Sequence, residues 1–291
     1  MSISASDVMK LRAMTGAGMM DCKNALEEAG GDMEKAADLL RKKGVVKAAK
    51  RADKVAADGV IMSAVSSDQK VGALVEVNSE TDFVAKSPDF LAFATEVAEV
   101  IRDQQPKGLE GLHALTLKNG KTVEATMSEL TLKIGEKITV RRFMRYESEG
   151  GSVAVYVHGS KIGTMVEVAP ANVALGAEVA LHIAAARPKY LNREMVDATE
   201  LNREKDIYAE QLRAQKKPEN IIENIVKGKL DKFYSEVCLL EQPFIKDEEV
   251  TVGKLAEKQG VKIVQFERYE LGEGMEKVTK DFASEVAEQL K

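Results

Sequence analysis

The chain has 291 residues, which is enough for about two domains of ordinary size. Apolar residues make up 44% and charged residues 31%, a balance that is typical of globular proteins and excludes a fibrous or wholly disordered chain. The 42 Lys and Arg are outnumbered by 47 Asp and Glu, so the net charge of -5 provides no general attraction for nucleic acid. Any basic contact therefore has to be local.

The composition favours a protein of the cytoplasm. No apolar run approaches the roughly 18 to 20 residues that cross a bilayer, and residues 1–11 lack the basic and then apolar order of a secretory signal. The two cysteines, Cys22 and Cys238, lie far apart in sequence and in unlike surroundings. This favours free reduced thiols over a disulfide.

The common motifs of catalysis and cofactor binding do not occur in the sequence. It has no Gly-Lys-Ser/Thr phosphate loop, no Gly-x-Ser-x-Gly elbow, and no HExxH or CxxC metal spacing. Residues 15–21 contain two glycines but lack the third glycine and the preceding strand of a dinucleotide loop, so we expect a turn between helices there. The histidines, His113, His158 and His182, are not at ligand spacing. We therefore expect no enzyme, no cofactor and no bound metal.

The first 44 residues are predicted to form three short helices. The expected ranges are Ser4–Met14, Met19–Ala29 and Asp32–Lys43, with Ser4 and Asp32 as caps. Pairs of glycines separate the helices, and Gly44 follows the third one at the place of a left-handed C-cap. Apolar residues at helical spacing would form a small shared core: Val8, Leu11, Cys22, Ala25, Leu26, Met33, Ala36, Ala37 and Leu40.

Residues 45–58 are interpreted as a basic connector. Together with the end of the third helix, the connector carries a run of cations: Lys42, Lys43, Lys47, Lys50, Arg51 and Lys54. This run favours one alternative function, a nucleic-acid-binding or ribosome-associated protein. Charge runs are more often solvated faces, and the acidic total argues against that alternative.

An internal repeat organises the rest of the chain. The octet Lys70–Val77 matches Lys161–Val168 almost position by position. The match extends to a preceding strand, a following helix and a closing strand: 59–65 with 152–158, 96–101 with 178–183, and 143–147 with 266–270. The sequence therefore predicts an α+β protein with two related subdomains, each a short antiparallel sheet with helices on one face.

The two copies differ in two places. The first copy has an additional segment after its octet, Asn78–Lys86. The second has an insert at about 187–229, whose two charged stretches flank Lys216-Lys217-Pro218 and predict two antiparallel helices. This hairpin could form a homodimer, hold a partner, or do neither. A last amphipathic helix is predicted at Met275–Leu290.

Three apolar side chains have two interpretations each. Met19 and Met20 are adjacent at a helix start and cannot both face one small core, so we expect one to face outward. It is either a scattered surface methionine or an adaptable contact. Phe83 lies among polar and charged residues in the segment that the second copy lacks. It either anchors its own loop or contacts a partner.

Several strings in one order resemble bacterial elongation factor Ts over nearly the whole length. They are Leu11-Arg12 with Thr15–Lys23, Ala56–Gly59, Glu80–Lys86, His158-Gly159 with Ile162-Gly163, Gln242–Phe244 and Gly272–Gly274. The resemblance implies a ubiquitin-associated-like helical module at 1–44, the linker at 45–58, a core N-subdomain at 59–148, a core C-subdomain with its helical hairpin at 149–271, and a C-terminal helical module at 272–291.

The resemblance also implies a function. Members of this family bind the GTPase elongation factor Tu carrying GDP, expel the nucleotide and stay bound until GTP enters. The segment that matches Thr81, Asp82, Phe83 and Val84 would dislodge the Mg²⁺ of the GTPase. Further partner contacts would map to Arg12, Met19, Met20, Lys23 and His158. By this interpretation the chain is not an enzyme and binds neither a membrane nor nucleic acid.

The residue types suit that role. Mg²⁺ needs near-octahedral oxygen ligands, so a small displacement of its supporting loop should weaken GDP binding strongly. Phe83 is a rigid aromatic side chain suited to displacing such a loop. Asp82 could accept hydrogen bonds that the displacement frees, or it could simply cap a local turn.

Overall fold

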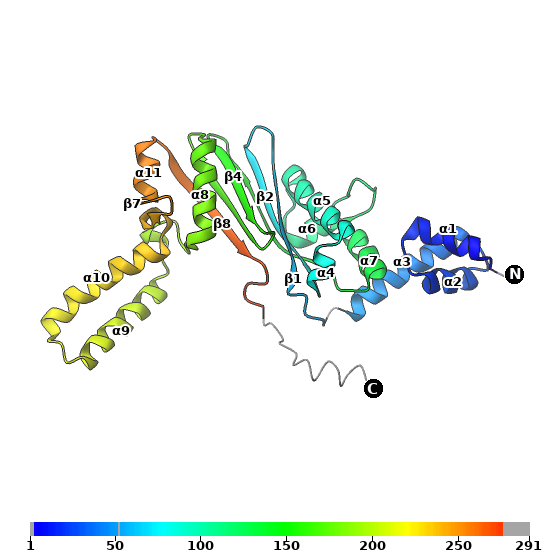
Figure 1. Cartoon of the computed structure of the whole chain (residues 1–291), viewed down its shortest axis with the longest axis horizontal. Helices are drawn as coiled ribbons and strands as arrows, with labels where there is room; N and C mark the ends of the chain where they lie inside the picture. The colour runs from blue at the N-terminus through cyan, green and yellow to red at the C-terminus, as the bar shows by residue number, and fades with distance from the viewer. Residues whose placement is uncertain (1–2, 52, 276–291) are drawn as a thin grey trace. The chain divides into compact units, whose positions relative to one another are not determined.

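The computed structural model describes residues 3–51 and 53–275. It has an α+β fold in which helices alternate with small sheets, as the sequence predicts (Figure 1). The chain divides into two compact units. Among the described residues, unit 1 comprises 3–51, 53–64, 75–143 and 270–275, and unit 2 comprises 65–74 and 144–269.

Unit 1 begins with three helices, α1 (Ala5–Thr15), α2 (Met19–Glu28) and α3 (Met33–Lys50). The Ser4 hydroxyl caps α1 by accepting a hydrogen bond from the Asp7 N–H at 3.1 Å, which confirms the predicted cap. Gly16 ends α1 in the left-handed conformation, with a φ of 68°. The core of this module contains the predicted residues, and Leu132 from a later helix, α7 (Val123–Ile134), completes it.

The prediction that Gly44 caps the third helix is wrong. Helix α3 continues through Gly44 to Lys50, so the first part of the expected connector is helical. A Cβ atom at Gly44 would lie 3.1 Å from the backbone oxygen of Ser128, and α3 packs against α7. Glycine is therefore present because two helix backbones approach closely there, and not because the chain turns.

The internal repeat is confirmed by two three-stranded sheets of equivalent order. The first contains β1 (Asp58–Val65), β2 (Val71–Ser79) and β3 (Thr139–Glu147), and the second contains β4 (Ser152–His158), β5 (Ile162–Ala169) and β8 (Lys262–Glu270). Each matched octet forms the central strand. Strands β4 and β5 are antiparallel, with Ser152 opposite Val168 and His158 opposite Ile162.

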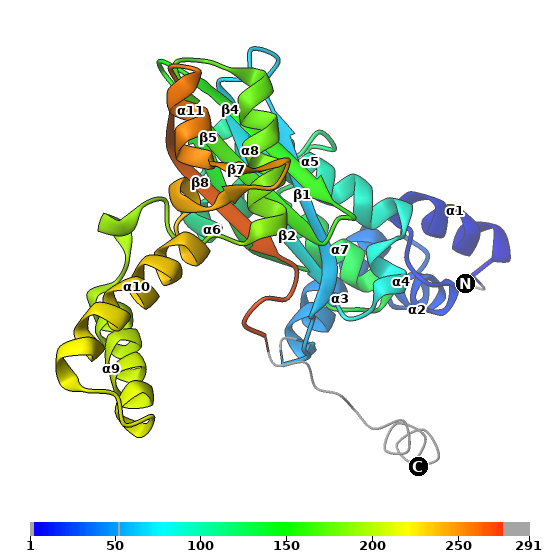
Figure 2. The same cartoon turned by 60° about the vertical axis from the view of Figure 1, so that its left-hand side comes forward.

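The predicted helix of each copy is also present. Helix α5 (Pro88–Gln104) follows the first octet, and α8 (Val173–Ala186) follows the second and packs against β4 and β5 (Figure 2). Unit 1 also contains α4 (Asp82–Ala85) and α6 (Gly108–Ala114), and unit 2 contains β6 (Pro243–Phe244), β7 (Asp247–Thr251) and α11 (Val252–Lys258). The core of unit 2 gathers α8, β5, β8 and α11.

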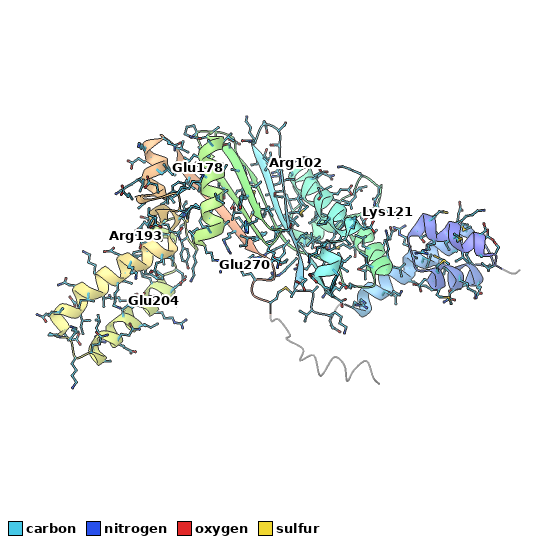
Figure 3. The ribbon with its side chains drawn as sticks, viewed as in Figure 1. Arg102, Lys121, Glu178, Arg193, Glu204 and Glu270 are labelled. Carbon is cyan, nitrogen blue, oxygen red and sulfur yellow. The ribbon has the colours of Figure 1, made fainter. Side chains whose placement is uncertain are left out.

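The insert of the second copy forms the predicted antiparallel pair of helices (Figures 1 and 2). They are α9 (Ala198–Ala214) and α10 (Glu219–Val237), and α10 is longer than expected. Leu212, Ile222 and Val226 are buried between them. At the base lies Arg193, which is labelled in Figure 3. Its guanidinium donates hydrogen bonds to Asp231 and Glu241. The final helix predicted at Met275–Leu290 lies, apart from Met275, outside the described residues.

Candidate functional site

The segment between β2 and α5 forms a short helical turn. Helix α4 has only four residues, and Thr81 is its N-cap, with its hydroxyl accepting a hydrogen bond from the Val84 N–H at 3.4 Å. In the second copy β5 is followed by a cis peptide bond at Ala169-Pro170, and α8 begins at Val173 with no equivalent turn. The structure therefore places Thr81, Asp82, Phe83 and Val84 together on one feature that only the first copy has.

Phe83 is the exposed residue of this turn. Its exposed fraction is 82%, whereas Val84 is buried at 9% and Ala85 at 5%. The side chains that anchor α4 to the core are thus those of Val84 and Ala85. The interpretation of Phe83 as an anchor under its own loop is wrong. An aromatic ring that folding leaves in water is available for a partner.

The N-cap of the turn is Thr81, and Asp82 is the first residue of α4. Its carboxylate pairs with the Lys86 ammonium at 2.6 Å, one turn along the chain, and both side chains are more than half exposed. Such exposed pairs contribute little to stability.

Two carboxylates attach the turn to the segment that follows α7. Glu136 accepts hydrogen bonds from the Thr81 N–H at 3.0 Å and from the Thr81 hydroxyl at 2.8 Å. In the opposite direction, Glu80 accepts from the Lys137 N–H at 2.6 Å. Glu80 also accepts from the Arg51 guanidinium at 2.5 Å. Hydrogen bonds to ionised carboxylates are stronger than those between neutral groups. The bonds from Thr81 to Glu136 and from Lys137 to Glu80 therefore hold the turn in place.

Glu80 and Glu136 are absent from the residues expected to act at this site. Glu136 is 55 positions from Thr81, and no spacing in the sequence connects them. The sequence offers one local signal, Gly135, because a glycine after a helical stretch indicates a turn that presents the next residues. In the structure Gly135 ends α7 in the left-handed conformation, with a φ of 87°.

The other predicted contacts of unit 1 lie on α1 and α2. Arg12 and Lys23 are exposed, and Lys23 lies 3.8 Å from Glu27 one turn along α2. Met19 is 49% exposed and Met20 is 65% exposed. The expectation that only one of them faces outward is wrong, because the buried face of α2 begins at Cys22.

His158 belongs to unit 2 and is exposed at the end of β4. Its Nδ1 lies 3.0 Å from the Tyr156 hydroxyl, and the two rings stack with centroids 6.1 Å apart. The ring is therefore oriented by a neighbour two residues earlier on the same strand. It is available at the surface as a hydrogen-bonding group.

Three cations of the basic run are used within unit 1. Lys43 pairs with Glu28 at 2.8 Å, Lys47 with Asp21 at 3.1 Å, and Arg51 with Glu80. These pairs connect α3 to α2 and to the segment before α4. A cation that already has an intramolecular partner contributes less to binding phosphates, so the run is a weaker nucleic-acid site than its sequence suggests.

Cys22, Cys238 and His182 are titratable groups that folding buries. Cys22 and Cys238 are free and buried, and burial raises the pKa of the Cys238 thiol to about 11. Burial lowers the pKa of His182. Within residues 3–51 and 53–275, no group of three His, Cys, Asp or Glu could hold a metal ion. No helix in the same ranges is long and apolar enough to cross a membrane.

Comparison with known proteins gives one consistent result. The family described as Elongation factor TS matches residues 80–273. The Elongation factor Ts of Alkalilimnicola ehrlichii is 49% identical over 291 residues, which cover 100% of this chain and 99% of that protein. Those of Methylococcus capsulatus and Halothermothrix orenii are 46% and 44% identical, again over 100% of this chain and 99% of the relative. The chain belongs to the elongation factor Ts family of translation elongation factors.

Proposed function

We propose that this chain is a guanine-nucleotide exchange factor that acts in the cytoplasm on the GTPase elongation factor Tu. The observation that carries the proposal is Phe83, which is 82% exposed on a turn that is capped and attached on both sides. The ring enters the GTPase beside its nucleotide site and displaces the loop that supports Mg²⁺. The metal belongs to the partner.

The mechanism needs no covalent step. Exchange is a linkage effect: a factor that prefers the nucleotide-free GTPase weakens nucleotide binding by the same factor by which nucleotide weakens the complex. GDP therefore leaves while the factor is bound, and GTP later displaces the factor. Within this chain the task is to present a surface that fits the nucleotide-free form better than the GDP form.

The energies decide how much Phe83 can do alone. Burying a Phe side chain contributes roughly 1.5 to 3 kcal/mol. Because a tenfold change in rate requires about 1.4 kcal/mol, Phe83 accounts for about one or two powers of ten. A larger acceleration requires the other surfaces, which we assign to Arg12, Met19, Met20 and Lys23 on α1 and α2 and to His158 on β4.

The decisive experiment measures release of labelled GDP from purified elongation factor Tu, with and without the chain. We expect the wild type to accelerate release and Phe83→Ala to fold normally but accelerate it about 10 to 100-fold less. Val173→Ala is a matched control, because Val173 is 49% exposed at the start of the equivalent helix α8. Equal rates for Phe83→Ala and the wild type would remove Phe83 from the mechanism.

The contacts on α1 and α2 are tested by affinity. Deleting residues 1–43 would cut α3 and expose Leu132, so point variants are preferable. We expect Met20→Ala and Arg12→Ala to weaken complex formation with elongation factor Tu, while the thermal unfolding temperature stays the same. Unchanged affinity in both variants would exclude this surface.

The hairpin of α9 and α10 has its own proposal, a homodimer contact. Ile207 and Ile221 are 36% and 44% exposed, and exposed apolar side chains on paired helices suit self-association. Sedimentation of the wild type and of an Ile207→Lys, Ile221→Lys variant tests it. A wild type that sediments as a monomer at high concentration excludes the dimer.

A further inference from the structure

Thr81 is held at each of its polar groups. Its N–H and hydroxyl donate to the two oxygens of Glu136, and its carbonyl accepts from the Ser79 hydroxyl at 2.9 Å. The same hydroxyl accepts from the Val84 N–H and so begins α4. The residue that starts the turn therefore has little freedom to move without breaking hydrogen bonds.

The residues that follow Phe83 in the chain are held in place by burial. Val84 and Ala85 follow it directly and are buried. Phe83 is thus a single exposed ring between a hydrogen-bonded cap and an apolar anchor. Its direction depends on the cap, because rotation of Thr81 would carry the first residues of α4 with it.

Glu136 is placed by elements remote from the turn in sequence. It follows Gly135, which ends α7, and α7 packs against α3, α5 and α6. The position of the Glu136 carboxylate is therefore set by a packed helix. The adjacent bond from the Lys137 N–H to Glu80 keeps the two segments in register.

A rigid arrangement of this kind serves a group that has to displace a loop. Binding energy that would otherwise order a mobile turn is available for the displacement, because the turn is already ordered. A ring misplaced by about 1 Å loses much of its effect, as with other groups that act by position. The carboxylate needs no contact with the partner for this role.

We propose that Glu136 is the positioning residue for nucleotide release: through Thr81 it holds Phe83 in the orientation that displaces the partner's metal-supporting loop. This rests on the proposed exchange function. Glu136 does not add to the surface that binds. Its removal therefore lowers the maximal rate of release, and the affinity of the complex changes little.

The test measures labelled GDP release from elongation factor Tu as a function of factor concentration. For Glu136→Ala we expect the maximal rate to fall about tenfold, and the half-saturating concentration to stay within about twofold. Glu136→Gln should restore most of the rate, because its amide oxygen can accept from the Thr81 N–H while its amide nitrogen donates to the Thr81 hydroxyl. A purely structural role of Glu136 would not lower the maximal rate while leaving the half-saturating concentration unchanged.

A double-mutant cycle shows whether Glu136 acts through Phe83. In a Phe83→Ala background, Glu136→Ala should cause no further loss beyond about twofold, because there is no ring left to position. Losses that multiply in the double variant overturn the proposal. So does a wild-type rate in Glu136→Ala.

Controls separate this inference from the proposed function. Glu129 lies on α7, the helix that precedes Glu136, and pairs with Lys121 at 2.6 Å (Lys121 is labelled in Figure 3). Glu129→Gln should therefore release GDP at the wild-type rate. If Glu136→Ala does not fold, Thr81→Val removes the same hydroxyl bond and should lower the maximal rate likewise.

A wild-type chain that leaves GDP release unchanged overturns the exchange function and this inference together. An active wild type with an equally active Glu136→Ala overturns only this inference.

Discussion

The carboxylate of Glu76 accepts a hydrogen bond from the backbone N–H of Gly272 at 2.9 Å, across 196 positions of the chain. Glu76 is fully buried in the central strand of the first sheet. Arg141 reaches it at 3.0 Å and Arg142 at 2.6 Å, and Asn78 donates at 3.1 Å. The two arginines also bind Glu273, so the cluster attaches the segment after β8 to unit 1.

The equivalent glutamate of the second copy has a simpler environment. Glu167 occupies the matched octet position in β5 and accepts from the Gln265 amide at 2.8 Å. Gln265 stands where the first copy has Arg142, when the closing strands are matched at Phe143 and Phe266. The two copies thus share a buried glutamate, but only the first uses it to bind two arginines and the returning chain.

Glu76→Gln should destabilise the protein by about 3 to 5 kcal/mol, because it removes the charge of a fully buried carboxylate to which two partly buried arginines are bound. Urea unfolding measures the loss. Glu167→Gln is the matched control and should cost about 1 kcal/mol, since it changes one ordinary hydrogen bond. Equal losses of unfolding free energy in the two variants would show that binding the two arginines adds nothing to stability.

The stability from Glu76 should also depend on pH. Burial raises the pKa of Glu76, but hydrogen bonds from Gly272, Arg142, Asn78 and Arg141 outweigh it and leave the pKa below its ordinary value of 4.5. A carboxyl with a lowered folded pKa gives stability that is complete above 4.5 and is lost as the pH falls through the lower folded value. The difference in unfolding free energy between wild type and Glu76→Gln should therefore shrink below that pH. A constant difference down to pH 3 would contradict this.

Much of the fold could be predicted from the sequence, because its signals are local or repeated. Ser4 and Asp32 are helix caps that need only neighbouring backbone groups. The octet of β2 recurs in β5, so the strand predicted for one copy supports the strand predicted for the other. The sequence around Gly44 is ambiguous, because a glycine after a helical stretch has the same local pattern whether it ends the helix or lets a second helix approach. Only the position of Ser128 distinguishes the two cases.

The difference between the two copies also indicates the position of the candidate site in the sequence, but it does not predict the geometry of the site. A four-residue helix has too little periodicity to show whether Phe83 or Val84 faces the core. The bond between Thr81 and Glu136 depends on how α7 packs, which no spacing in the sequence reveals. Exposure and positioning are tertiary properties, whereas the presence of an extra segment is a property of the sequence.

Gly44 in α3 and Gly228 in α10, two of the glycines that lie within helices, should respond oppositely to replacement by alanine. At Gly228 in α10 an added Cβ meets nothing within 4 Å, so Gly228→Ala should stabilise the hairpin by about 0.5 to 1 kcal/mol. At Gly44 the added Cβ presses on the Ser128 carbonyl, so the same gain should be offset or reversed. Thermal unfolding compares the variants, and equal stabilisation at both sites would mean that α3 and α7 separate easily.

His182 should make unit 2 sensitive to mild acid. Its side chain is fully buried, with Nε2 donating to the Gln242 amide oxygen at 3.0 Å and Nδ1 accepting from the Ile245 N–H at 3.3 Å. This assignment follows because the Gln242 nitrogen already donates to the Ala186 and Glu236 carbonyls. A proton on Nδ1 would remove the acceptor for Ile245.

Burial lowers the pKa of His182, although the bond to Gln242 acts in the opposite direction. The unfolded chain then takes up a proton below the ordinary value of 6.5 while the folded chain does not, so stability is complete above 6.5 and falls as the pH drops below it. His182→Gln keeps a donor for Gln242 but leaves Ile245 unpaired, which should cost about 1 to 2 kcal/mol at pH 7.5. Its urea unfolding should then change less than that of the wild type between pH 7.5 and 5.5, so the gap between the two narrows. Parallel pH dependences would show that His182 takes up a proton as readily in the folded protein as in the unfolded chain.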